Sequence, residues 1–221
     1  MGYSLEEVAT FQKGFAFKSK DFIDKGTKLV KVSNLTDDSV NANECVNIDE
    51  GQAQNYNKYS LVKDDIIITT VGSWPTNPTS VVGKVVKVPD ELNNSLLNQN
   101  AVRLRGNEKV VQNYLYYLLK SNDFKEYIIG TAQGSANQAS ITQKDIKSFK
   151  YEIPNKPLQK SIAHILTTLD EKIEVNNQIN KNLETMVQAI FKQWFVTLNF
   201  LMKRENLTNL AVEKWLEVSL G

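Results

Sequence analysis

The residue types that most often carry catalysis are scarce in this 221-residue sequence. It has one histidine, His164, and one cysteine, Cys45, whereas a serine or cysteine nucleophile needs a base beside it. His164 falls early in a long helical pattern, off its apolar positions, so we interpret it as a surface residue rather than a base or ligand. A single cysteine also excludes an internal disulfide and a cysteine-rich zinc site.

Nucleotide-binding and nuclease patterns are incomplete in the sequence. Gly83 and Lys84 lack the upstream glycine of a P-loop, and no GxGxxG fingerprint occurs. The Asn-Pro-Thr run at 77–79 lacks the proline and aromatic residue that follow it in amino-methyltransferases, and the Pro-Asp-Glu run at 89–91 has no lysine placed to complete a nuclease metal site. The sequence therefore predicts a non-catalytic protein with no cofactor and no bound metal.

One long amphipathic pattern dominates the C-terminal part of the chain. Its apolar residues alternate between spacings of four and three, which keeps one stripe facing a partner helix, as in a coiled coil. No glycine or proline interrupts residues 158–195, so we expect a helix roughly 55 Å long at ~1.5 Å per residue. The stripe consists of Ile162, Leu166, Leu169, Ile173, Asn176, Asn180, Leu183, Val187, Ile190 and Trp194.

The two asparagines at the centre of the stripe specify how it pairs. A seam asparagine costs stability unless it meets a partner, and it fixes the register when it does. If two identical helices pair antiparallel with Asn176 opposite Asn180, every apolar residue of the stripe meets an apolar residue; a shift of one heptad places asparagine against valine or isoleucine. We therefore expect an antiparallel homodimer through residues 154–198. The alternative is a helix that folds onto its own domain.

The residues before this helix predict a mixed α/β globular domain. The β-branched run at 64–72 is typical of a strand buried on both faces. The other expected elements are strands at 28–32, 81–88 and 96–104, helices at 112–122 and 123–129 that join near Ser121, one helical turn at 19–22 capped by Ser19, and a loop at 130–140. The chain as a whole is expected to be α+β, with a globular domain (1–153), a dimerisation helix (154–198) and a helical tail (199–221).

Composition narrows the class of protein. Its 41% hydrophobic and 23% charged residues are ordinary for a soluble protein. No apolar run is long enough to span a membrane and the N-terminus is no signal peptide, so we expect a cytoplasmic protein. The net charge is only +1, whereas nucleic-acid-binding domains are commonly basic. Lysines nevertheless crowd residues 13–31, where an ordinary solvated surface is the alternative to a binding face.

Residues 153–196 and five shorter motifs carry a family likeness. The motifs GFAFKSKDF, LVKVSNL, DIIITTVGS, LNQNAVRL and GSANQASIT follow one another in this order. They resemble landmarks of the target recognition domains of type I restriction-modification specificity subunits. The segment 153–196 resembles the conserved helical region of the same subunits. Family members usually carry two recognition domains and two helices, so this chain resembles a half-length specificity subunit.

The resemblance implies a subunit that reads double-stranded DNA and does no chemistry itself. A type I methyltransferase subunit and an ATP-driven type I restriction subunit would assemble on it, and no membrane is involved. A symmetric pair of such chains would read a bipartite, palindromic site, because symmetric readers bind symmetric half-sites. The alternatives are a coiled-coil structural adapter without a DNA role and a stand-alone DNA-binding regulator.

The residues expected to touch DNA are lysines and polar loop side chains. Phosphate contacts position a protein, whereas Asn, Gln, Ser and Thr can read base edges. The expected phosphate contacts are Lys13, Lys18, Lys20 and Lys31. The expected base-reading candidates are Ser33, Asn34, Ser73, Trp74, Thr76, Asn77, Thr79, Ser135, Asn137 and Gln138. For each one, an ordinary solvated loop residue is the alternative.

Overall fold

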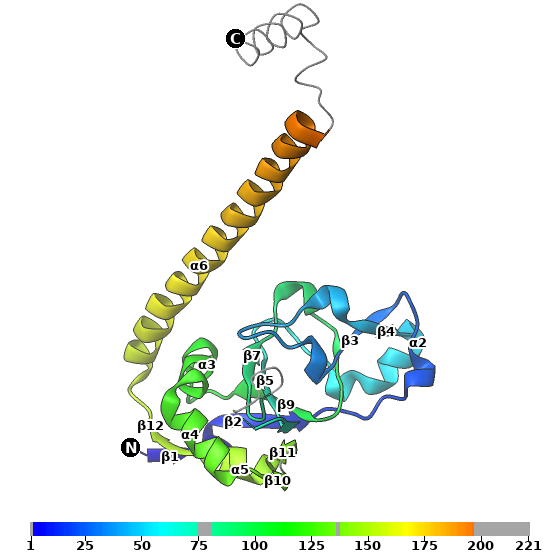
Figure 1. The fold of residues 1–221 in the computed structure, drawn as a ribbon. Coiled ribbons are helices and arrows are strands. Elements are labelled where there is room, and N and C mark those ends of the chain that lie inside the picture. Colours follow the sequence, from blue (N-terminus) through cyan, green and yellow to red (C-terminus); the bar gives the residue numbers. More distant parts are fainter. Residues whose placement is uncertain (1, 75–80, 136–137, 197–221) are drawn as a thin grey trace, which may run out of the picture. The chain divides into compact units, whose positions relative to one another are not determined.

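The structure is a computed structural model that describes residues 2–74, 81–135 and 138–196. The chain divides into two compact units, Met1–Thr167 and Thr168–Gly221. The first unit contains all the strands of the described residues and most of their helices (Figure 1). The second unit contains the greater part of one long helix. The α+β class predicted from the sequence is confirmed.

A four-stranded antiparallel sheet forms the centre of the first unit. Its order is β2 (Ala9–Lys13), β9 (Ala101–Gly106), β5 (Ile66–Thr69) and β7 (Val85–Lys87). Every residue of β5 is buried, as its β-branched run predicts. Ile66 and Ile68 enter one hydrophobic core and Ile67 enters another, because successive strand side chains point to opposite faces.

Helices cover the face of the sheet that carries Ile66 and Ile68. They are α1 (Leu5–Val8), α3 (Gln112–Lys120), α4 (Asn122–Thr131) and α5 (Gln143–Lys147), and each contributes buried side chains to the larger core. The predicted join between α3 and α4 is confirmed at Ser121, whose hydroxyl oxygen accepts a hydrogen bond from the Phe124 backbone N–H at 3.4 Å. That bond satisfies one of the free N–H groups at the start of α4.

A smaller sheet builds the outer lobe of the first unit (Figure 1). Its order is β4 (Val46–Ile48), β3 (Thr27–Val30) and β8 (Leu96–Leu97), and the short helix α2 (Glu50–Ala53) lies in the same lobe. The predicted strand at 28–32 ends earlier, at Val30, because the chain turns over Val32–Asn34. The Asn34 side-chain oxygen accepts a hydrogen bond from the Lys31 backbone N–H at 2.8 Å and holds this turn.

The start of the chain lies beside the segment that leads into the long helix. Strand β1 (Gly2–Ser4) pairs antiparallel with β12 (Lys150–Glu152). Ser4 then caps α1, because the Ser4 backbone N–H and hydroxyl both donate to the Glu7 carboxylate, at 2.7 and 2.8 Å. These hydrogen bonds to the charged form lower the pKa of Glu7.

Four further local predictions are wrong. Residues 130–140 are not a loop but contain a hairpin of β10 (Gln133–Ser135) and β11 (Gln138–Ser140), which joins β6 (Val71–Gly72). Its small polar residues lack the apolar alternation by which a strand is recognised. The helical turn predicted at 19–22 is a 3-10 turn over Ser19–Asp21, and its N-cap position is occupied by Lys18 rather than Ser19. The strand predicted at 81–88 is limited to β7, because the chain turns ahead of it with Gly83 at a φ of +76°. The strand predicted at 96–104 is instead two strands in different sheets, β8 and β9, separated by a bend at Asn100 with a φ of +69°.

Helix α6 (Lys156–Phe191) begins in the first unit and continues into the second, where a π-helical turn, Lys192–Val196, follows it. Its first turns pack on the first unit: Ala163 is buried and Ile162 lies against the larger core. Gln159 is buried, and its side-chain oxygen accepts from the Val111 N–H at 2.8 Å. The alternative of a helix folded on its own domain therefore holds for these first turns.

From Leu169 onward, the α6 stripe is solvent-exposed within the chain. Leu169, Ile173, Leu183 and Val187 all keep at least half of their surface exposed, whereas apolar stripes are normally covered. The expected tail, 199–221, lies outside the described residues. In the part of the chain that the structure describes, no helix is both long and apolar enough to cross a bilayer.

Candidate nucleic-acid interface

The structure brings the ends of two predicted recognition loops together. The Trp74 indole N–H donates to the Ser135 carbonyl oxygen at 2.7 Å, which ties the chain before residues 75–80 to the hairpin strand β10. An isolated β-bridge between Ser73 and Val81 joins the two ends of the first loop. Ser135 and Gln138 lie opposite each other at the end of the hairpin, and both are exposed. Four candidate base readers lie outside the described residues: Thr76, Asn77, Thr79 and Asn137.

Two of the predicted base-reading residues are buried in the protein interior. Asn34 is buried, with its side-chain oxygen on the Lys31 N–H and its amide group donating to the Glu44 carbonyl at 2.9 Å. An amide committed in this way cannot pair bidentately with adenine, so Asn34 is corrected to a turn-stabilising residue. Ser73 is also buried, and its carbonyl oxygen accepts from the Val82 N–H at 3.0 Å. Ser33, the residue before Asn34, is exposed.

The four predicted phosphate-contacting lysines occupy different environments. Lys13 ends β2, while Lys18 and Lys20 flank or lie in the turn Ser19–Asp21, and all three are exposed. Lys31 is half-buried, and its ammonium lies 5.7 Å from the centre of the Phe22 ring. That cation–π contact favours a Lys31 side chain that lies against the Phe22 ring.

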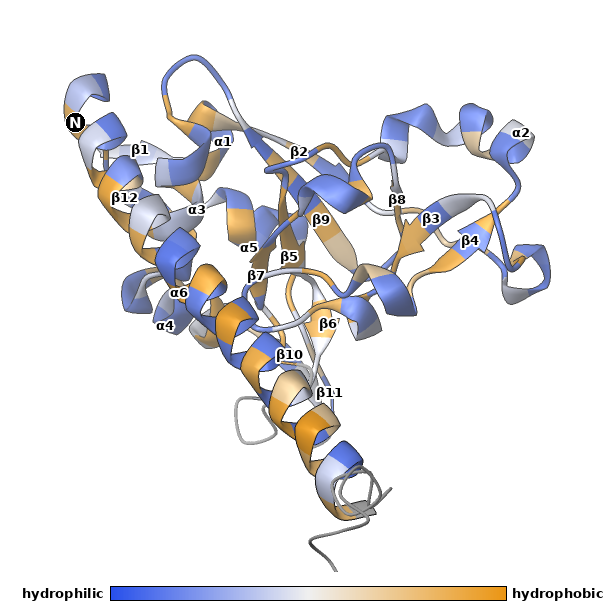
Figure 2. Ribbon diagram, turned by 90° about the horizontal axis from the view of Figure 1, so that it is seen from above, coloured by the Kyte–Doolittle hydropathy of each residue, from blue (hydrophilic) through white to orange (hydrophobic). Residues whose placement is uncertain are grey.

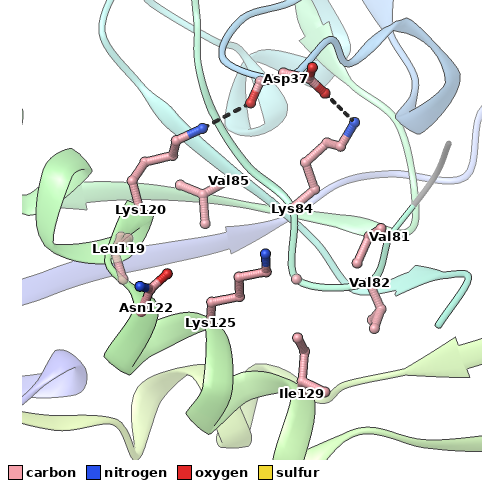
Figure 3. Close-up of a pocket in the computed structure, with 11 residues that line it drawn as sticks. Asp37, Val81, Val82, Lys84, Val85, Leu119, Lys120, Asn122, Lys125 and Ile129 are labelled. Atoms are coloured by element: carbon pink, nitrogen blue, oxygen red, sulfur yellow. Dashed lines mark hydrogen bonds and ion pairs between the residues drawn. The ribbon is translucent and has the colours of Figure 1, made fainter. Parts of the chain in front are cut away.

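The structure also assembles a basic pocket that the sequence did not reveal. Lys84, Lys120 and Lys125 line a pocket of about 290 Å³ together with Asp37 (Figure 3). The three lysines come from the turn before β7, the end of α3 and the second turn of α4. No spacing in the sequence signals this group, because its members meet only through the packing of α3 and α4 on the sheet.

The single cysteine and the single histidine lie in separate parts of the structure. Burial raises the pKa of the Cys45 thiol, which donates a weak hydrogen bond to the Asn41 carbonyl at 3.5 Å. His164 lies exposed on α6. Within residues 2–74, 81–135 and 138–196, no three His, Cys, Asp or Glu residues gather as a metal site.

The sequence is similar to that of known proteins. Residues 1–185 match the family described as "Type I restriction modification DNA specificity domain". The type I restriction enzyme HindI specificity subunit of Haemophilus influenzae is 35% identical over 141 residues, which cover 63% of this chain and 29% of that protein. The putative type I restriction enzyme MjaX specificity subunit of Methanocaldococcus jannaschii is 26% identical over 219 residues, covering 93% of this chain and 50% of that protein.

Two solved structures share the fold. The S subunit of a type I restriction-modification system from M. genitalium superposes with a TM-score of 0.65 at 20% identity, over 94% of this chain and 50% of that one. The HsdS subunit from Thermoanaerobacter tengcongensis gives a TM-score of 0.52 at 16% identity, over 88% and 44%. This chain thus spans half or less of the length of these relatives. The match over residues 1–185 shows that the chain belongs to the family of type I restriction modification DNA specificity domains.

Proposed function

We propose that this chain is the DNA-reading component of a type I restriction-modification complex. It recognises a sequence and does no chemistry, while a methyltransferase subunit and a restriction subunit act where it binds. The observation that carries the proposal is the family match over residues 1–185, which spans the whole globular unit and most of α6. The complex would work on double-stranded DNA in the cytoplasm.

The globular unit would read DNA through the two loops that meet at Trp74 and Ser135. Loops held on a rigid scaffold are where recognition residues usually lie, and the indole hydrogen bond and the hairpin pairing provide such a scaffold. Exposed Ser33, Ser135 and Gln138 would face base edges, together with the candidates in 75–80 and 136–137. Lys13, Lys18, Lys20 and Lys31 would contact phosphates on either side.

The exposed stripe of α6 would pair with a second copy of the chain. Hydrophobic residues recur along α6 (Figure 2), and the stripe from Leu169 to Ile190 is solvent-exposed within the chain. An antiparallel copy covers it with matched apolar layers and places Asn176 against Asn180 of the partner helix. Ile162 would then contact both its own core and the end of the partner stripe at Trp194.

Cysteine crosslinking will test the direction and the register of the pair. With Cys45→Ser as background, a chain carrying Leu169→Cys and Val187→Cys should form disulfide-linked dimers under mild oxidation, because these positions face each other in the antiparallel register. Leu169→Cys alone should not crosslink. Dimers of that single variant, seen on a non-reducing gel, would instead show a parallel pair.

The seam asparagines give a second test. Replacing both Asn176 and Asn180 with leucine should raise the melting temperature, because two polar layers become apolar, and should loosen the register. Circular dichroism at the helix minimum measures the first effect, and crosslinking of Leu169→Cys in this background measures the second. A markedly lower melting temperature would mean that the asparagines do not lie at a helix–helix interface.

The DNA target itself tests the whole proposal. Two identical recognition domains related by two-fold symmetry should read two inverted copies of one short motif around an unread spacer. The chain should be co-expressed with a type I methyltransferase subunit, and modified adenines should be mapped across the host genome. A bipartite palindrome is expected. An asymmetric motif would refute the homodimer as the reading unit, and no sequence-specific methylation would refute the DNA-reading role.

A further inference from the structure

The basic pocket, lined by Lys84, Lys120 and Lys125, lies beside the ends of the two candidate recognition loops. Val81, which lines it, directly follows residues 75–80 and bridges to Ser73. On the other side, Lys125 and Ile129 belong to α4, which leads into β10 of the hairpin. The elements that carry both loops therefore also form the walls of the pocket.

Positive charge dominates the pocket. The Lys84 side chain is only 15% exposed, and its nearest carboxylate, Asp37, lies 3.5 Å away and is 96% exposed. An ion pair with so exposed a partner is screened by water and gives little in return for burying the lysine. Lys120 pairs with the Asp38 carboxylate and donates to the Asp37 carbonyl at 3.0 Å.

Lys125 differs from Lys84 and Lys120 in its contacts. Its side chain forms no hydrogen bond or ion pair with the described part of the chain, and it projects into the pocket between the other two lysines (Figure 3). Three ammonium groups thus lie near two carboxylates, Asp37 in the pocket lining and Asp38 beside Lys120, which leaves an excess of positive charge. Gly83 allows close packing next to the pocket, because a Cβ there would lie 2.7 Å from Ile128 Cγ2.

We propose that this pocket binds a phosphate group of the DNA backbone and so sets the position of both recognition loops on the duplex. The inference rests on the proposed DNA-reading function and adds to it a particular contact. Lysine ammonium groups bind phosphate as point charges. At about 290 Å³ the pocket has room for a phosphate group together with bridging water, since one water takes up ~30 Å³.

Charge-neutral variants of the full chain will test the contact. Lys125→Gln should weaken binding to a mixed-sequence DNA duplex roughly five- to ten-fold at ~0.1 M salt and lower the slope of log K against log salt by about 0.9. Asp37→Asn should act in the opposite direction and tighten binding, because it removes the carboxylate that competes with phosphate. Lys150→Gln, an exposed lysine on β12 outside the pocket, is the matched control and should change neither quantity.

The outcomes separate this inference from the proposed function. If the wild-type chain binds DNA and both pocket variants leave affinity and slope unchanged, the pocket contact is wrong while the DNA-reading role stands. If the wild-type chain binds no DNA, both fail. If inorganic phosphate binds and is lost in Lys125→Gln while DNA binding is unaffected, the pocket is a free-anion site and the inference is overturned. A loss confined to one DNA sequence would indicate base reading and would also overturn it.

Discussion

Ile173→Ala in α6 is expected to dissociate the proposed homodimer. Ile173 is 58% exposed in the single chain, so the partner helix would bury most of its surface. Burying such a side chain contributes ~1.5–3 kcal/mol, and the symmetric dimer contains the residue twice. The dissociation constant should therefore rise by roughly two to four orders of magnitude. Analytical ultracentrifugation across a concentration series measures this change directly.

Val175→Ala is the matched control for this experiment. Val175 lies on the same turn of α6 and is 57% exposed, but it is outside the heptad stripe. Its replacement should leave the dissociation constant within about a factor of three, because position c of a heptad does not enter the seam. Equal effects of the two substitutions, or a wild-type chain that sediments as a monomer, would refute pairing through this stripe.

Asp65→Asn, directly before β5, is expected to destabilise the globular unit by about 3 kcal/mol. Asp65 is buried and accepts a forked pair of hydrogen bonds from Arg105 of β9, at 2.5 and 2.7 Å, and one from the Val62 N–H at 2.8 Å. The hydrogen-bonded carboxylate raises the pKa of Arg105. Asparagine would place a donor among these donors and leave the guanidinium without its counter-charge, and breaking a buried pair typically costs ~3–5 kcal/mol.

The adjacent Asp64 provides the comparison. Its carboxylate lies 3.9 Å from Lys87 with 41% of the side chain exposed, and its φ is +66°, which asparagine tolerates. Asp64→Asn should thus cost less than about 1 kcal/mol. Urea denaturation, with hydrogen exchange of the β5 and β9 amides as a local readout, compares the two. Equal losses would show that the Asp65–Arg105 pair does not stabilise the sheet.

Local patterns in the sequence determined much of the fold. The unbroken run of β-branched residues predicted the buried strand β5, and Ser121 marked the join of α3 and α4, because strand burial and helix capping depend on neighbouring residues. The helix α6 and its exposed stripe followed from the heptad spacing. The family likeness, carried by motifs in order, also came from the sequence and is confirmed.

Only the tertiary structure decided how the candidate site is assembled. Trp74 meets Ser135, and Lys84, Lys120 and Lys125 share one pocket, although tens of residues separate most of these positions in the chain. It also moved Asn34 from the candidate readers to the interior of a turn. Side-chain periodicity specifies which face of an element is buried, but not which elements pack together. That depends on long-range contacts, and so do the charges and hydrogen bonds at the candidate site.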